Sequence, residues 1–149
     1  MKINDLNYAI ANGGPAARYE RPIINLWAAI CRMYFPDSTN IRGGPTWAVD
    51  TEANKGSAND MEAHIPDVVT VKLIPAEPTY QKRDYLWVEC KKAALDRPSG
   101  WKDVLKGAVT HLSLVHANRD VFLIIAIGTK CMLLAWNPLN TIQQPQLGI

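Results

Sequence analysis

Two acidic residues and a lysine stand at a spacing that could support metal-dependent chemistry. Asp67 follows Pro66 at the start of one apolar segment, and Glu89 and Lys91 lie in the next such segment. Carboxylate oxygens are hard ligands suited to Mg²⁺ or Mn²⁺, which keeps open positions for water and for a substrate oxygen. A nearby lysine ammonium could position or deprotonate a water molecule, or neutralise developing negative charge, since burial and a metal both lower its pKa.

Strand alternation explains how two of these residues would meet. Residues 85–91 (YLWVECK) have the composition of a strand, in which every second side chain points to the same face. We therefore expect Glu89 and Lys91 to project to one side, together with Tyr85 and Trp87, and the reverse face to carry Leu86, Val88 and Cys90. A face that carries Tyr85 and Trp87 opposite three apolar residues is not typical of an open, solvated strand face.

The surrounding segments predict a sheet covered by helices. The apolar run at 121–127 is typical of a strand buried on both faces, which requires helices on both sides of the sheet. Helical spacing of apolar residues and proline- or glycine-rich turns give the other boundaries. The predicted elements are a helix over 20–35, strands over 46–53, 68–74 and 85–91, a helix over 101–117, strands over 121–127 and 131–136, and an irregular tail over 137–149, with 75–84 as a connecting loop.

The order of these elements and of the polar residues resembles a known family. Pro66-Asp67 at one strand and Glu89-Cys90-Lys91 in the next resemble the signature of the PD-(D/E)XK nuclease superfamily, an Asp followed by Glu-x-Lys on adjacent strands. GTKCMLLAW, beginning at Gly128, is similar to the turn and strand that close the sheet in several fungal and bacterial members. The resemblance implies an α/β, restriction-endonuclease-like domain over residues 1–149, with a central mixed five-stranded sheet flanked by helices in the order αβββαββ, and a fungal member is one interpretation.

The resemblance also implies an activity and a set of site residues. It predicts a nuclease that hydrolyses DNA phosphodiester bonds with Mg²⁺ or Mn²⁺ held by Asp67, Glu89 and the backbone carbonyl of Cys90, with Lys91 assisting. Glu20, at the start of the first predicted helix, corresponds to a helical Glu that joins the metal and the catalytic group in many members. Each residue also has a plainer interpretation: a first-turn Glu interacts with the helix dipole, Asp after Pro begins turns, and Glu-x-Lys occurs on solvated strands.

Nucleic-acid contacts are expected from basic residues near this site. The net charge of +2 does not by itself indicate a polyanionic partner, because binding depends on a local basic face. The second predicted helix carries two lysines on its polar face, although a solvated helix face would look the same. The candidates are Arg21, Lys92, Lys102 and Lys106.

Composition predicts a compartment and leaves alternatives open. Three widely spaced cysteines, Cys31, Cys90 and Cys131, are interpreted as buried thiols of an intracellular protein, in the nucleus or the cytoplasm, and no membrane segment is expected. A homodimer stays an open alternative, since cutting both strands of a duplex usually pairs two sites. Two other functions also stay open: a catalytically inactive module of the same fold that binds nucleic acid or assembles with partners, and an RNA-cleaving endonuclease.

Overall fold

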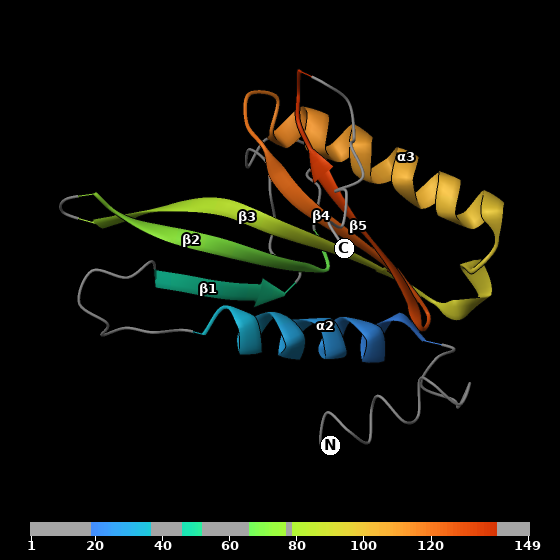
Figure 1. The fold of residues 1–149 in the computed structure, drawn as a ribbon. Helices are drawn as coiled ribbons and strands as arrows, with labels where there is room; N and C mark the ends of the chain where they lie inside the picture. Colours follow the sequence, from blue (N-terminus) through green and yellow to red (C-terminus); the bar gives the residue numbers. More distant parts are fainter. Residues whose placement is uncertain (1–18, 37–45, 52–65, 77–78, 140–149) are drawn as a thin grey trace, which may run out of the picture.

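The chain forms an α/β structure with one mixed sheet and a helix on each side of it. A computed structural model describes residues 19–36, 46–51, 66–76 and 79–139. Among these residues the elements follow in the order α2, Glu20–Tyr34; β1, Thr46–Thr51; β2, Val68–Ala76; β3, Thr79–Lys91; the 3₁₀ turn η2, Ala93–Leu95; α3, Pro98–Val115; β4, Val121–Ile127; and β5, Lys130–Trp136. The predicted α/β class and the mixed five-stranded sheet are confirmed (Figure 1).

The five strands lie in the sheet in the same order as in the chain. β1, β2 and β3 form an antiparallel meander, β3 and β4 run parallel, and β5 returns antiparallel to β4. Parallel strands need a crossover connection, and α3 supplies it between β3 and β4. The parallel register sets Glu89 beside Ile125 and Lys91 beside Ile127, so the polar end of β3 lies next to an apolar strand end.

Each helix covers its own face of the sheet and forms its own core. α2 contributes Ile23, Ile24, Ala28 and Cys31 to a cluster with Val68 of β2 and alternate residues of β3. α3 contributes Ala108 and Leu112 to a second cluster, which includes Trp87 and most of the inner residues of β4. Figure 1 shows the two helices on opposite sides of the sheet. Burial on both faces explains why β4 is apolar along its whole length.

The connection between β2 and β3 was predicted wrongly as a loop. Pro75 and Ala76 belong to β2, and β3 begins at Thr79, six residues before the predicted start at Tyr85. Every residue from Thr79 to Arg83 is exposed, so this part of β3 has no alternation of buried and exposed side chains from which a strand could be predicted. Residues 79–84 form a strand because their backbone pairs with that of β2. The paired residues run from Val71 opposite Asp84 to Ala76 opposite Thr79.

A β-bulge corrects the expected faces of β3. The register between β2 and β3 shifts at Thr70 and Val71, which pair with Leu86 and Asp84, so Tyr85 is the extra residue. Tyr85 therefore does not share a face with Trp87. Its ring contacts Phe35, which follows α2, and Trp47 of β1, whereas Trp87 is in the cluster under α3.

The exposure of the three cysteines partly contradicts the prediction. Cys31 and Cys90 are buried free thiols, but Cys131 is exposed, contrary to the prediction for all three. Cys131 shares a strand face with Leu133, which is also exposed. No helix in the described part of the chain is long and apolar enough to cross a membrane. Residues 137–139 of the predicted tail are neither helix nor strand, and its remainder lies outside the described residues.

Candidate functional site

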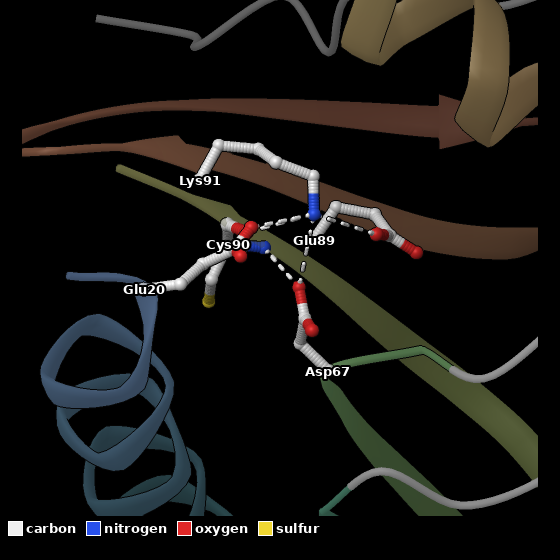
Figure 2. A network of polar contacts seen from close by, with 5 residues as sticks. All are labelled: Glu20, Asp67, Glu89, Cys90 and Lys91. Atoms are coloured by element: carbon white, nitrogen blue, oxygen red, sulfur yellow. Dashed lines mark hydrogen bonds and ion pairs between the residues drawn. The ribbon is translucent and has the colours of Figure 1, made fainter. Parts of the chain in front are cut away.

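The structure brings the four predicted catalytic side chains together at one end of the sheet. Asp67 immediately precedes β2, Glu89 and Lys91 lie in the last three residues of β3, and Glu20 is the first residue of α2. Val68 pairs with Val88, so the residues on either side of that pair, Asp67 and Glu89, come to the same end of neighbouring strands. Figure 2 shows Asp67, Glu89 and Glu20 on different sides of the Lys91 ammonium.

Lys91 lies at the centre of the group. Its Nζ atom is 2.8 Å from Oε1 of Glu20, 3.7 Å from Oδ2 of Asp67 and 4.0 Å from Oε2 of Glu89. It also donates a hydrogen bond of 3.0 Å to the backbone carbonyl of Cys90. One cation is therefore surrounded by four oxygens that come from three separate segments of the chain (Figure 2).

The acidic groups differ in how firmly they are held. Asp67 accepts a 2.6 Å hydrogen bond from the backbone N–H of Cys90, which ties the start of β2 to β3. The side chains of Glu89 and Asp67 are only 8% and 17% exposed, whereas that of Glu20 is 43% exposed. Two carboxylates are thus largely buried at the ends of neighbouring strands, and the third approaches from a helix end and is more exposed.

Burial changes the acid strength of Asp67. Loss of solvent raises the pKa of its carboxyl, and the nearby charges of Glu89 and Glu20 act in the same direction. The Cys90 N–H bond and the Lys91 ammonium lower the pKa, but together they do not offset the effect of burial. The ionised form of Asp67 is therefore less favourable in the folded protein than in water, and a further cation nearby would stabilise it.

The expected lowering of the Lys91 pKa is not what the structure shows. Burial by itself lowers the pKa of this ammonium, but the hydrogen bond from Lys91 to Glu20 and the charges of Asp67 and Glu89 outweigh it, so the pKa is raised. The sequence does not reveal that three carboxylates surround the Lys91 ammonium, and these carboxylates raise its pKa. Lys91 is therefore a cation at neutral pH in the protein without metal.

The donor set suits a hard divalent cation, although its present spacing suits an ammonium. Within residues 19–36, 46–51, 66–76 and 79–139, no three His, Cys, Asp or Glu side chains are close enough to hold one metal ion as they stand. The oxygens of Glu20, Asp67 and Glu89 are nevertheless of the type that Mg²⁺ and Mn²⁺ prefer, and they already gather around a positive charge. The chemical type of these donors therefore suits a divalent cation, whereas their present spacing does not.

The part of Cys90 that could bind a metal is its carbonyl. Burial, followed by the charges of Asp67 and Glu89, raises the pKa of the Cys90 thiol far above its usual range, and its side chain belongs to the core under α2. A protonated, buried thiol is a poor ligand. Its carbonyl oxygen instead faces the Lys91 ammonium, as the hydrogen bond between them shows.

The predicted nucleic-acid contacts are exposed and lie near the site in the chain. Arg21 follows Glu20 at the start of α2, Lys92 follows Lys91, and Lys102 and Lys106 lie on α3, the helix after the site strand. All four residues are exposed, as a phosphate contact requires. Arg21 and Lys92 are direct neighbours of site residues in the chain, whereas η2 separates the two lysines of α3 from the site strand.

Two features near the site strand were not anticipated. The backbone N–H of Gly128, in the turn between β4 and β5, donates a 3.0 Å bond to the Lys91 carbonyl and fixes the end of β3. At the other end of the parallel section, buried Asp84 accepts bonds from the Trp87 indole and from His116. Gly-Thr after an apolar run was a visible turn signal, but the Asp84 contacts depend on the bulge and on how α3 ends.

A cavity of about 440 Å³ lies at that second end, and it is not lined by Glu20, Asp67 or Glu89. It is lined by residues of the β2–β3 hairpin and of the outer ends of β4 and β5, including Arg83, Asp84, Phe122 and Trp136. None of its described lining residues is among the predicted site residues. The acidic site and this cavity are therefore separate features of the sheet.

Comparison of the chain with models of protein families, with curated proteins and with solved structures found no match in any of the three.

Proposed function

We propose that the protein is a metal-dependent nuclease of the restriction-endonuclease-like class that hydrolyses phosphodiester bonds in DNA. The observation that carries this proposal is the meeting of Glu20, Asp67 and Glu89 around a single cationic group at the ends of two adjacent strands. The resemblance in sequence order and the topology of the sheet support the same class.

Charge explains why a metal belongs in the proposed mechanism. Three ionised carboxylates and one ammonium leave the group with two negative charges, and an anionic phosphate would be repelled by it. A bound Mg²⁺ or Mn²⁺ would cancel these two negative charges and supply Lewis-acid stabilisation and an activated water. Asp67 and Glu89 would hold the ion from the sheet, and Glu20 and the Cys90 carbonyl would complete the ligand set.

Lys91 would act as a cation in this mechanism. Its pKa is raised in the protein without metal, where it is an ammonium, and an ammonium could bind a phosphate oxygen and neutralise charge there. Its side chain is 30% exposed, so a substrate at the end of β3 can reach it. The exposed lysines of α3 would bind the nucleic-acid backbone beside the site.

A cleavage assay tests the proposal. Supercoiled and linear DNA are incubated with the purified protein and Mg²⁺ or Mn²⁺, and nicking is expected only with the metal present. Asp67→Ala and Lys91→Ala should each reduce the rate by about a hundredfold or more, since even supporting groups of metal sites contribute 10–100-fold. Asp50→Ala, which removes an acid paired with Lys82 on β3, is the matched control and should cleave normally. Full activity in both site variants would refute the proposal.

A second candidate is a non-catalytic module of the same fold that binds nucleic acid or assembles with partners. The observation that favours it is that the acids surround Lys91 instead of standing close enough together for a metal. Calorimetric titration with Mn²⁺ separates the two, because a module of this kind should bind no Mn²⁺ even at millimolar concentration. The same cleavage assay run on RNA distinguishes an RNA-cleaving endonuclease from one that acts on DNA.

A further inference from the structure

We infer that the Lys91 ammonium and the divalent metal are alternative occupants of the same oxygen cage, so that Lys91 holds the site closed to metal until its side chain moves out. The inference rests on the proposed function, because it concerns the metal site named there. It adds a role for Lys91 before catalysis: the counterion of the metal-free protein and a competitor of the metal.

The geometry excludes both cations from the cage at once. The four oxygens of the cage come from Glu20, Asp67, Glu89 and the Cys90 carbonyl, and Lys91 Nζ lies 2.8–4.0 Å from each of them. A metal bound at about 2.1 Å from the same oxygens would occupy the space that the ammonium fills. Two cations at that separation would also repel each other strongly, since their interaction energy grows as the inverse of distance.

The surroundings allow Lys91 to leave without disturbing the sheet. Its backbone is fixed by β3 pairing with β4 and by the Gly128 N–H bond to its carbonyl, so only the side chain has to turn. That side chain is a flexible four-carbon stem and is already 30% exposed. Its shortest ion pair is with Glu20, the most exposed of the three acids, and pairs with so much solvent contribute little to stability.

The backbone that carries Asp67 and Glu89 would stay in place when Lys91 turns, and rotation of the side chains would bring their oxygens, now 3.7 and 4.0 Å from Nζ, in to metal distance. Asp67 is held by the Cys90 N–H, and Glu89 is buried within the strand. Removing the ammonium takes one positive charge away from these acids, which makes the space that it leaves more attractive to a replacement cation. The apparent affinity for metal is therefore the intrinsic affinity multiplied by the fraction of molecules in which Lys91 has left the cage.

Mn²⁺ binding to the intact chain tests this competition. We would measure it by electron paramagnetic resonance and calorimetry, without nucleic acid, for the wild type and for Lys91→Met, which keeps the length of the stem and removes the charge. Lys91→Met is expected to bind Mn²⁺ about tenfold more tightly than the wild type. This factor corresponds to a wild type in which Lys91 occupies the cage in about nine molecules of ten. Lys72→Met, the same change at an exposed lysine of β2 outside the proposed site, controls for the loss of one positive charge and should stay within about twofold of the wild type.

A second readout protects the test against poor folding of the variant. Lys91→Arg keeps a cation at the same position and should bind Mn²⁺ no more tightly than the wild type. Thermal unfolding should show Lys91→Met melting below the wild type without metal and gaining more from added Mn²⁺, because binding to the folded state alone raises its stability. Equal or weaker Mn²⁺ binding by Lys91→Met would overturn the inference.

The failures of the two proposals are distinguishable. If the wild type binds Mn²⁺ and Lys91→Met binds it no better, the competition is refuted while the metal site stands. If no variant, Lys91→Met included, binds Mn²⁺ at millimolar concentration, the metal site itself is refuted and the competition with it.

Discussion

The backbone N–H of Cys90 donates a 2.6 Å hydrogen bond to Oδ2 of Asp67, joining the residue before β2 to the end of β3. Cys90 itself is fully buried, with its side chain in the core under α2. The position of the Asp67 carboxylate is therefore set by the sheet backbone and the core, not by a flexible side-chain partner. An acid fixed in this way is preorganised for binding a cation and costs stability while it is charged.

The first prediction concerns that cost. Because the pKa of Asp67 is raised, its ionised form is less favourable in the folded than in the unfolded protein, so it destabilises the fold above its pKa. Asp67→Asn should therefore be more stable than the wild type at pH 7. The gain should shrink as the pH falls and vanish below 3.8, the ordinary value for an aspartate, where Asp67 is protonated in both states.

Urea unfolding of both proteins between pH 3 and pH 8 measures the difference. Asp50→Asn is the control, because this acid is partly exposed on β1 and forms an ion pair with Lys82, so its removal should bring no gain. A wild type more stable than Asp67→Asn at pH 7 would contradict the predicted sign. A gain that persists unchanged below pH 3.8 would show that it does not come from the charge.

The basic residues of α3 give the second prediction. If Lys102 and Lys106 contact phosphates, each change to alanine should weaken DNA binding for all sequences alike and reduce the slope of log K against log salt by about one. Fluorescence anisotropy over a salt series, with Ca²⁺ in place of the active metal, measures both. Lys72→Ala removes one exposed charge from β2 and is expected to leave the slope unchanged. Unaltered slopes for Lys102→Ala and Lys106→Ala would assign these lysines to a solvated helix face.

The third prediction concerns the turn that holds the end of β3. Gly128 has a φ of 60°, and a Cβ there would lie 2.9 Å from the Cβ of Ala93. Gly128→Ala should cost about 1–2 kcal/mol for the left-handed conformation, and the contact adds to that cost. Gly107→Ala, in α3 with open space around it, should instead stabilise the protein by about 0.5–1 kcal/mol.

Both changes can be followed by thermal unfolding. Since the Gly128 N–H bonds to the Lys91 carbonyl, Gly128→Ala should also weaken Mn²⁺ binding, whereas Gly107→Ala should not. Combining Gly128→Ala with Ala93→Gly should recover the part of the loss that comes from the close contact. If the stability changes of Gly128→Ala and Ala93→Gly simply add in the double variant, the left-handed conformation alone accounts for the loss caused by Gly128→Ala.

The fourth prediction concerns the buried Asp84 network. Asp84 is 5% exposed and accepts bonds from the Trp87 indole at 2.9 Å and from Nε2 of His116 at 3.1 Å. Arg119 donates to Nδ1 of His116, so the imidazole proton lies on Nε2 and points to Asp84. Asp84→Ala should cost about 3–5 kcal/mol, because buried donors lose their acceptor.

Chemical denaturation measures this cost, with Asp103→Ala on the exposed face of α3 as the control. That control should change the free energy of unfolding by no more than about 0.5 kcal/mol. A loss under 1 kcal/mol for Asp84→Ala would mean that the neighbouring groups find other partners. The network lies at the opposite end of the parallel section of β3 from Glu89, so Mn²⁺ binding by the folded variant should be retained.

Local patterns in the sequence determined much of the fold and part of the site. The continuous apolar run from Val121 to Ile127 predicted both ends of β4, because turn residues flank it on each side. Alternation in the second half of β3 correctly separated Glu89 from Cys90, since successive side chains of a strand point to opposite faces. Helical spacing and Pro36 located α2 to within one residue.

Tertiary structure decided the contacts between segments that are distant in the chain. Pairing of Val68 with Val88 brought Asp67 to Glu89, and packing of α2 on the sheet brought Glu20 to Lys91. The bulge at Tyr85 moved that ring to the α2 face, and hairpin pairing made a strand of exposed residues that alternation could not reveal. Local periodicity reports only which side of its own element a residue faces. The pKa of Lys91 depends on charges from other elements, so its direction follows only from the folded chain.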